Sequence, residues 1–377
     1  MKQKHLLILS GPMGSGHERA AQALQEYAKL KYPDIRVTNI NVKDYMSALI
    51  KFIYSRLYII CNNHFPVLWS IVYSKTDTPH GSSFLERTIY SVRHQTGRRI
   101  VKMILKQHAD FIICTHYLPA ELLNKLKKSG RITVPVSSVI TDFSLHWIYV
   151  QPYLDKFCVA SEELKFRLQA NGIPEDHIHI TGIPVMADFA KDFSKAEILE
   201  MKKALNLPLH DKIILLMMGG ESKNKLINLA HLLLKRFPNK AFIVFSGKNE
   251  NLLEKLEELQ KDYPGQLFPV SFTNEVWRYM AVSNTVVSKP GGISMSECIA
   301  MRKPMIIMYP IPGQEEKNAD YLLEKSIVSK AYDEISLIYK ELLMSREEKH
   351  FVENMQWQFE KLRKPRASQD ILEISLR

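Results

Sequence analysis

Short apolar runs alternate along this chain with longer segments in which apolar residues recur every three or four positions. Runs of about four to eight residues rich in Ile, Leu, Val and Phe are typical of buried strands, and the amphipathic segments between them are typical of helices. The pattern predicts strands at residues 5–10, 35–42, 110–115, 134–141 and 156–160, and again at 212–217, 241–245, 267–270, 285–288 and 305–309.

This alternation predicts an α/β protein made of two domains. Strands that alternate with helices form parallel sheets, and a chain of 377 residues is long enough for two of them. Residues 187–209 have few strand signals and are expected to form a linker followed by a helix. We therefore predict two Rossmann-like, doubly wound domains facing across a cleft, at residues 1–190 and 191–377. The tail from 351 to 377 is predicted to be helical, and its last helix can pack back on the first domain.

The composition indicates an ordinary globular protein without a membrane-spanning helix. Hydrophobic residues make up 46% of the chain and charged residues 24%. The apolar run near the N-terminus is only about five residues long, too short for a signal peptide, and no stretch of about 18 apolar residues lacks charge. The four cysteines are widely spaced and form no CxxC pair, which favours a reduced, cytoplasmic setting.

The positive charge is concentrated in the first half of the chain. The net charge is +11, and residues 36–131 contain 15 basic and 5 acidic residues, a net +10. An aromatic stretch at 45–73 precedes basic residues at helical spacing, and together they favour a peripheral helix on an anionic membrane surface. The membrane-contact residues predicted from this pattern are Arg93, Arg98, Arg99 and Lys102. A buried helix followed by a solvated basic face is the alternative, and no nucleic-acid-binding module accompanies the charge.

The segment after the predicted strand at 285–288 has the features of a phosphate site. Pro290, Gly291 and Gly292 allow a tight turn that starts a helix. The unsatisfied N–H groups at a helix start, together with the positive end of the helix dipole, favour an anion such as a diphosphate. Glu297, five residues further on, could accept hydrogen bonds from a ribose.

The loop after the next strand adds polar side chains to the same predicted crevice. Gln314 and Glu315 follow the strand at 305–309 and place an amide and a carboxylate there. The alternative is an ordinary strand–loop–helix connection with a Gly-rich turn. The combination of Glu297 with the Gln-Glu pair favours a ligand site over that alternative.

Two further candidates follow strands in the first half. Gly11 and Gly16 are spaced as in a P-loop, but His17-Glu18 stands where the Lys-Ser/Thr pair is needed, so a nucleotide triphosphatase is not expected. Arg19 likewise breaks the dinucleotide-binding pattern. His17 is expected either to contact a ligand or to cap its helix. Asp142 follows the strand at 134–141 and is expected to face the ligand crevice.

Several motifs occur together in a fixed order over roughly residues 5–325. They are GSGHERAA (14–21), TDFSLHWIY (141–149), VASEELKFRL (159–168), GIPEDHIHITGIPV (172–185), FSGKNENL (245–252) and KPGGISMSE with PGQEEKN (289–318). In this combination the chain resembles the monogalactosyl- and glucosyl-diacylglycerol synthases. These are inverting GT-B glycosyltransferases related to the peptidoglycan N-acetylglucosaminyltransferase.

The resemblance implies a role for each matching residue. GT-B enzymes bind the nucleotide sugar mainly in the C-terminal domain and the acceptor mainly in the N-terminal domain. Asp142 occupies the position of the proposed general base, and His17 is the second catalytic candidate. The implied acceptor-side residues are Gly14, Gly16 and His146. The implied donor-binding residues are Gly219, Gly220, Gly247, Lys289, Gly291, Gly292, Ile293, Glu297, Gln314, Glu315 and Asn318.

The expected chemistry uses no metal ion and no cofactor. Inverting transfer needs a base that deprotonates the acceptor hydroxyl, and it needs the leaving diphosphate to be stabilised. A helix N-terminus can stabilise the diphosphate without a metal ion. The sequence contains nothing that resembles a DxD metal site. One departure from the family is Glu221 in the Gly-rich loop at 217–223, whose carboxylate would lie near the diphosphate unless Lys223 offsets it.

The leading interpretation is a cytoplasmic enzyme, peripheral on the inner face of the cell membrane. It would move a hexose from UDP-glucose or UDP-galactose to a diacylglycerol-type lipid in glycolipid biosynthesis. The alternatives are a transferase for another lipid such as the undecaprenyl carrier, a UDP-sugar 2-epimerase of the same fold, and a non-catalytic UDP-sugar sensor. Glucose and galactose differ in the orientation of one hydroxyl, so the sequence leaves the sugar open, together with processivity and oligomeric state.

Overall fold

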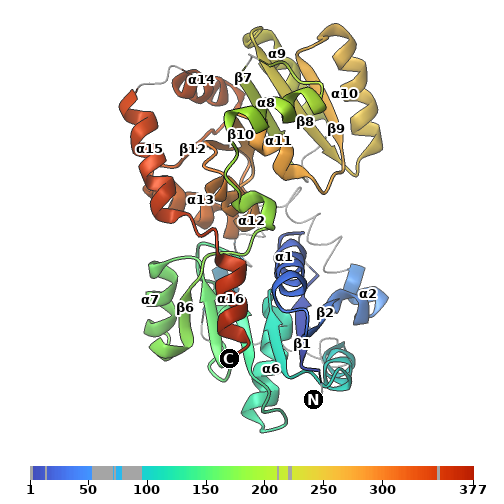
Figure 1. Cartoon of the computed structure of the whole chain (residues 1–377), viewed down its shortest axis with the longest axis vertical. Helices are drawn as coiled ribbons and strands as arrows, with labels where there is room; N and C mark the ends of the chain where they lie inside the picture. The colour runs from blue at the N-terminus through green and yellow to red at the C-terminus, as the bar shows by residue number, and fades with distance from the viewer. Residues whose placement is uncertain are drawn as a thin grey trace. The chain divides into compact units, whose positions relative to one another are not determined.

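The computed structural model describes residues 3–12, 15–52, 71, 74–78, 96–209, 212–219, 223–345 and 349–377. The chain divides into two compact units (Figure 1). Unit 1 consists of Met1–Ala187 together with two later segments, Ile311–Asn318 and Lys364–Arg377. Unit 2 consists of Asp188–Pro310 and Ala319–Arg363.

Unit 1 is built on a six-stranded sheet in the order β2-β1-β3-β4-β5-β6, in which every pair is parallel. Its strands are β1 (His5–Ser10), β2 (Arg36–Asn41), β3 (Phe111–Cys114), β4 (Val136–Val139), β5 (Lys156–Val159) and β6 (Ile178–Ile180). Its helices are α1 (Gly16–Lys31), α2 (Ala48–Phe52), the helical residues 96–106, α6 (Tyr117–Lys128), α7 (Glu162–Ala170) and α16 (Ala367–Ser375).

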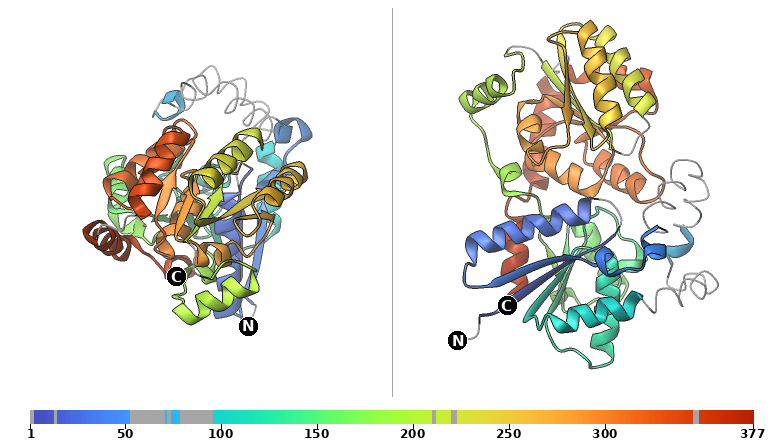
Figure 2. Two further views of the ribbon diagram at one scale, coloured as in Figure 1. Left: turned by 90° about the horizontal axis from the view of Figure 1, so that it is seen from above. Right: turned by 90° about the vertical axis from the view of Figure 1, so that its right-hand side faces the viewer.

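Helices cover both faces of this sheet because alternate residues of its strands point in opposite directions. Leu7 and Leu9 of β1 pack into a core shared with α6 and α7. Leu6 and Ile8 of the same strand pack into a second core with α1 and α16, and Figure 2 shows these helices beside the strands. All six residues of β1 are buried, as expected for a parallel strand between two helical layers.

Unit 2 repeats this architecture with the strand order β12-β11-β10-β7-β8-β9, again with parallel pairs. Its strands are β7 (Lys212–Met217), β8 (Lys240–Gly247), β9 (Leu267–Ser271), β10 (Thr285–Ser288), β11 (Met305–Ile307) and β12 (Val328–Lys330). Its helices are α8 (Lys195–Ala204), α9 (Lys223–Arg236), α10 (Glu250–Asp262), α11 (Val276–Val282), α12 (Gly292–Ala300), α14 (Glu334–Ser345) and α15 (Lys349–Leu362). Helix α13 (Gln314–Glu324) begins in the 311–318 segment of unit 1 and continues into unit 2.

The two parallel sheets confirm the predicted α/β class. The predicted strands at 5–10, 212–217 and 285–288 have the observed bounds, and the others are correct within a few residues. Two strands were missed, β6 and β12, because each has three residues at a sheet edge and neither forms an apolar run. The predicted helical tail is two helices, and Pro365 lies in the break because its ring cannot continue a helix.

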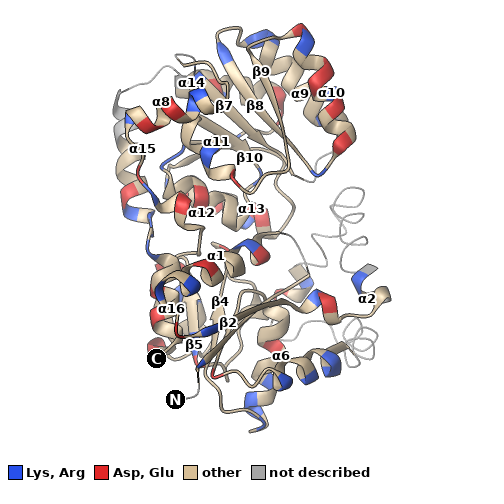
Figure 3. Cartoon of the chain, turned by 45° about the vertical axis from the view of Figure 1, so that its right-hand side comes forward, with Lys and Arg blue, Asp and Glu red and all other residues tan. Residues whose placement is uncertain are grey.

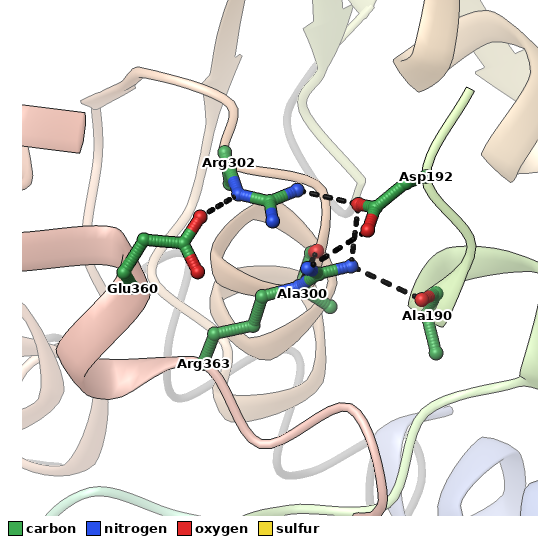
Figure 4. A network of polar contacts seen from close by, with 6 residues as sticks. All are labelled: Ala190, Asp192, Ala300, Arg302, Glu360 and Arg363. Carbon is green, nitrogen blue, oxygen red and sulfur yellow. Dashed lines mark hydrogen bonds and ion pairs between the residues drawn. The ribbon is translucent and has the colours of Figure 1, made fainter. Parts of the chain in front are cut away.

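A charged network fixes the C-terminal end of α12 within unit 2 (Figure 4). Arg363 donates from Nε to the carbonyl of Ala300, the last residue of α12, at 2.7 Å, and from Nη2 to Asp192 at 2.8 Å. Arg302 pairs with the same Asp192 at 2.5 Å and also with Glu360. Hydrogen bonds from Arg302 and Arg363 lower the pKa of Asp192. The helix that carries the predicted phosphate site is thereby held at its far end.

The last helix docks in unit 1 at a position where a glycine is required. Tyr27 of α1 donates to Gln369 at 2.8 Å, and Ser368 donates to the carbonyl of Val185 at 3.2 Å. Gly182 lies beside this contact with φ +82°, and an added Cβ would be 2.5 Å from the Cβ of Lys364. The site therefore excludes a side chain both by backbone conformation and by space.

We expect Gly182→Ala to destabilise unit 1 more than Gly172→Ala does. Both glycines have nearly the same positive φ, but Gly172 has no atom within 4 Å of an added Cβ. The control should lose about 1–2 kcal/mol from backbone strain alone, and Gly182→Ala roughly 1–3 kcal/mol more from the clash. Urea unfolding followed by circular dichroism measures both, and equal losses would mean that Lys364 moves aside at no cost.

Candidate active site

His17 lies at the start of α1 and is held by the ends of two neighbouring strands of unit 1. Its Nδ1 is 2.7 Å from the carbonyl oxygen of Thr115, after β3, and 2.9 Å from Oγ1 of Thr141, after β4. Thr115 Oγ1 in turn donates to the His17 carbonyl at 2.9 Å. Because a carbonyl oxygen only accepts, Nδ1 carries the proton, and the lone pair of the neutral ring is on Nε2.

The surroundings keep this imidazole uncharged near neutral pH. Burial lowers the pKa of His17 below its usual value of 6.5, against the opposing effects of the Asp142 carboxylate and the hydrogen bond to Thr115. The residue as a whole is nevertheless half-buried. A neutral, oriented imidazole that a ligand can reach is suited to accept a proton through Nε2.

A second histidine, His116, packs edge-on against His17 with the ring centroids 4.6 Å apart. Its Nδ1 accepts from the N–H of Leu118 at 3.1 Å and so caps α6. An added Cβ at Gly11 would be 2.1 Å from the His116 ring, so Gly11 leaves room for it. Burial lowers the pKa of His116 well below its usual value. Sequence reasoning did not single out Thr115 and His116, although a polar pair directly after an apolar strand is the same signal that identified Asp142.

Asp142 follows β4 and is 3% exposed. Gln314 donates from Nε2 to its Oδ2 at 2.7 Å, and Asn318 donates from Nδ2 to its Oδ1 at 3.1 Å. The N–H of Phe143 donates to Oδ1 of Asn318 at 2.9 Å. Gln314, Glu315 and Asn318 were predicted with the donor-binding residues, but they belong to unit 1, and two of them bind Asp142.

Another residue of the segment at 311–318, Lys317, supports the loop that follows Asp142. Lys317 pairs with Asp77 at 2.6 Å, and Asp77 accepts from the N–H of Trp147 at 2.7 Å. His146, one of the three predicted acceptor-side residues, uses Nδ1 to accept from the N–H of Ile148 at 3.1 Å. Its Nε2 lies 3.4 Å from Oγ1 of Thr76. In this structure His146 therefore shapes the loop.

The other predicted donor residues follow strands of unit 2. Gly219 follows β7, Gly247 ends β8, and Lys289 follows β10. In a parallel sheet these positions lie at one edge, outside the carboxyl ends of the strands. The N-terminus of α12 is at the same edge.

The N-terminus of α12 has an open approach and a buried carboxylate nearby in sequence. Gly291 is its N-cap and has no atom within 4 Å of an added Cβ, and no side chain caps the helix. Gly292 and Ile293 form the buried first turn. Glu297, which is 3% exposed, lies further along the same helix. A helix start without a side-chain cap has the backbone N–H groups that the predicted anion site needs.

Several predicted features lie outside the described residues. They are the residues Gly14, Gly220, Glu221 and Arg93 and most of the aromatic stretch at 45–73. Within the part of the chain that the structure describes, His, Cys, Asp and Glu side chains form no group of three or more that could hold a metal ion. In that same part, each helix is too short or too polar to cross a bilayer.

We expect the pKa of His17 to lie below 6.5 and to fall further in Asp142→Asn. The carboxylate raises the pKa of the ring, so removing its charge favours the neutral imidazole. Carbon-13 NMR titration of labelled histidine measures both values, with the His17 signal assigned from its loss in His17→Gln. Asp34→Asn, which removes an exposed carboxylate of unit 1, is the control and should leave His17 unchanged. An increase in the His17 pKa in Asp142→Asn would contradict the arrangement.

Comparison with known proteins identifies a family for each half of the chain. Residues 17–185 match the monogalactosyldiacylglycerol (MGDG) synthase family, and residues 213–371 match the glycosyltransferase family 28 C-terminal domain. A protein of Bacillus pumilus named processive diacylglycerol beta-glucosyltransferase is 26% identical over 377 residues, covering 98% of this chain and 94% of that protein. The protein of the same name from Bacillus licheniformis is 26% identical over 337 residues, covering 88% of this chain and 85% of its own.

Solved structures with low sequence identity share the fold. Acinetobacter baumannii MurG superposes with a TM-score of 0.59 at 13% identity, covering 99% of both chains. The UDP-GlcNAc 2-epimerase of Neisseria meningitidis superposes with a TM-score of 0.60 at 15% identity, also covering 99% of both chains. These findings confirm the resemblance inferred from the motifs. The chain has the GT-B fold and is a glycosyltransferase in which residues 17–185 match the MGDG synthase family and residues 213–371 match the glycosyltransferase family 28 C-terminal domain.

Proposed function

We propose that this enzyme transfers a hexose from a UDP-sugar to diacylglycerol, with inversion at the anomeric carbon. The observation that carries the proposal is a neutral, oriented His17 beside a buried carboxylate, Asp142, in the unit that matches the MGDG synthase family. Relatives named diacylglycerol beta-glucosyltransferases support the acceptor and the linkage. UDP-glucose and UDP-galactose are α-linked, so a β-linked product requires inversion.

His17 is the better candidate for the general base, although the sequence favoured Asp142. Its Nδ1 proton is directed at the Thr115 carbonyl, which leaves Nε2 to accept the proton of an acceptor hydroxyl. His17 is a half-buried residue, whereas Asp142 is 3% exposed and accepts one amide hydrogen bond on each oxygen. An acceptor hydroxyl can therefore reach His17 more easily than Asp142.

Asp142 then acts through its charge. As the hydroxyl attacks, His17 becomes an imidazolium, and a nearby carboxylate stabilises that cation. The amides of Gln314 and Asn318 hold the carboxylate without neutralising it, because neither carries a charge. In this proposal His17 accepts the proton, and Asp142 supplies a fixed negative charge.

The donor side of the proposal rests on unit 2. The N-terminus of α12 presents backbone N–H groups at the positive end of the helix dipole, where the leaving diphosphate would gain negative charge. Gly291 allows close approach, and Glu297 is the proposed ribose partner. Glucose is the favoured sugar, because the relatives are named glucosyltransferases.

Incubation with UDP-glucose or UDP-galactose and diacylglycerol vesicles should yield a β-hexosyl diacylglycerol, identified by mass spectrometry and by the anomeric proton coupling. His17→Gln and Asp142→Asn should each lower kcat by roughly two to four orders of magnitude, the usual contribution of a base or its supporting charge. Asp34→Asn, at an exposed carboxylate, should keep full activity.

The pH dependence separates the two roles. The activity of the unaltered enzyme should fall as the pH decreases through the pKa of His17, below 6.5, because the protonated ring cannot accept a proton. In Asp142→Asn this limb should move to lower pH, since the pKa of His17 decreases. If Asp142 were the base, the limb would instead disappear. A free sugar altered at C2, with no lipid product, would indicate an epimerase.

We further propose that unit 1 binds an anionic membrane surface through an exposed basic helix face. Within the helical residues 96–106, Ile100, Met103 and Ile104 are buried, whereas Arg98, Arg99 and Lys102 are exposed. Helix α6 contains further lysines in its last turn, and Figure 3 marks basic positions on this helix in blue. The proposal rests on this separation of apolar and basic faces and on the lipid acceptor of the relatives.

Replacing Arg98, Arg99 and Lys102 together by Gln should weaken binding to anionic vesicles by roughly 10- to 100-fold, because basic residues near anionic headgroups attract the surface. Raising the salt concentration should weaken binding of the unaltered protein as well. The control replaces the exposed Lys235, Arg236 and Lys255 of unit 2 by Gln, which changes the net charge equally. Vesicle co-sedimentation measures both, and equal losses would mean that only total charge matters.

A further inference from the structure

The first turn of α13 directs two side-chain amides at one carboxylate. Gln314 and Asn318 are four residues apart and therefore lie on the same face of the helix. Gln314 Nε2 donates to Asp142 Oδ2 at 2.7 Å, and Asn318 Nδ2 donates to Asp142 Oδ1 at 3.1 Å. Each carboxylate oxygen thus has its own donor, which fixes both the position and the rotation of the group.

The orientation of the Asn318 amide follows from its other neighbour. The backbone N–H of Phe143 can only donate, so the atom that faces it at 2.9 Å is the carbonyl oxygen of Asn318. The amide nitrogen is therefore directed at Asp142. Asn318 is 0% exposed, so a rotated amide would leave buried groups unsatisfied. One side chain binds both the Asp142 carboxylate and the next backbone N–H.

We propose that Asn318, assisted by Gln314, is a positioning residue that holds the Asp142 carboxylate in place beside His17. The inference rests on the proposed function and extends it, because it identifies the residues that hold the Asp142 carboxylate, whose charge supports His17. Lys317, in the same turn, is paired with Asp77, so the side-chain groups that bind Asp142 there are neutral. Among the described residues, Asp142 and Glu18 are the charged groups that raise the pKa of His17.

Asn318→Asp gives the most specific test, because it changes the donating nitrogen to an oxygen and keeps the acceptor for Phe143. When the new carboxyl and Asp142 share one proton, that proton replaces the lost N–H donor, and the pair carries the single negative charge of the unaltered site. Two buried carboxylates in contact bind this proton more tightly than either would alone. The variant should therefore keep the acidic limb that His17 produces and gain a second limb, losing activity as the pH rises and the pair loses its proton.

Asn318→Leu removes the donor at every pH. We expect kcat to fall by roughly 10- to 100-fold while the KM for the UDP-sugar stays within about threefold, because the loss affects the supporting charge of the base and not donor binding. Asn171→Asp is the matched control, since it makes the same chemical change at an exposed amide of unit 1 that donates to Arg167. It should have the activity and pH profile of the unaltered enzyme.

A measurement that needs no substrate separates this inference from the proposed function. If Asn318 positions Asp142, the His17 pKa measured by NMR should fall in Asn318→Leu, in the direction expected for Asp142→Asn. An unchanged His17 pKa overturns the positioning role even if the enzyme is an active transferase. A lowered His17 pKa supports it even if diacylglycerol is not the acceptor. If Asn318→Leu does not fold, Asn318→Asp decides, and a pH profile without a new limb overturns the inference.

Discussion

Parallel strands buried on both faces constrain where this protein can place its chemistry. Each strand is covered by helices, so polar side chains that must meet a ligand can stand only where the strands end. Thr115 and Thr141 follow neighbouring strands of unit 1, and both contact His17 at the start of α1. In unit 2 the same constraint places Gly247 and the N-terminus of α12 at the carboxyl ends of the strands. The sites in both units follow from this rule of sheet geometry.

That rule also explains which parts of the site could be predicted from the sequence. Asp142 and the Gly-rich start of α12 were found because each directly follows an apolar run, a local signal. The contacts of His17 with Thr115 and Thr141 join residues 98 and 124 positions apart. No short segment of the sequence determines which strands are neighbours in the sheet. The strand order β2-β1-β3-β4 determines that contact, and it emerges only from the fold.

The segment at 311–318 makes contacts that its sequence did not indicate. Its sequence predicted contacts with the donor, because it follows a strand of the second half of the chain. In the structure the chain returns to unit 1 for these residues, and Gln314 and Asn318 bind Asp142 there. Strand periodicity reports local structure and carries no information about such a return. Asn318 is fully buried in the structure, and a fully buried polar residue needs specific partners, which here are Asp142 and the Phe143 N–H.

The choice of amides at this place has a physical reason. A lysine or arginine against Asp142 would form a stronger bond, but its positive charge would cancel the field that stabilises a protonated His17. Amides donate hydrogen bonds without charge, so they fix the carboxylate and leave its negative charge to act on the imidazole. Lys317 lies between the two amides in sequence, yet it pairs with Asp77. The positive charge of Lys317 is thus paired with Asp77 and not with Asp142, the carboxylate that stabilises a protonated His17. The network around Asp192 in unit 2 has no such restriction, and there two arginines bind one carboxylate directly.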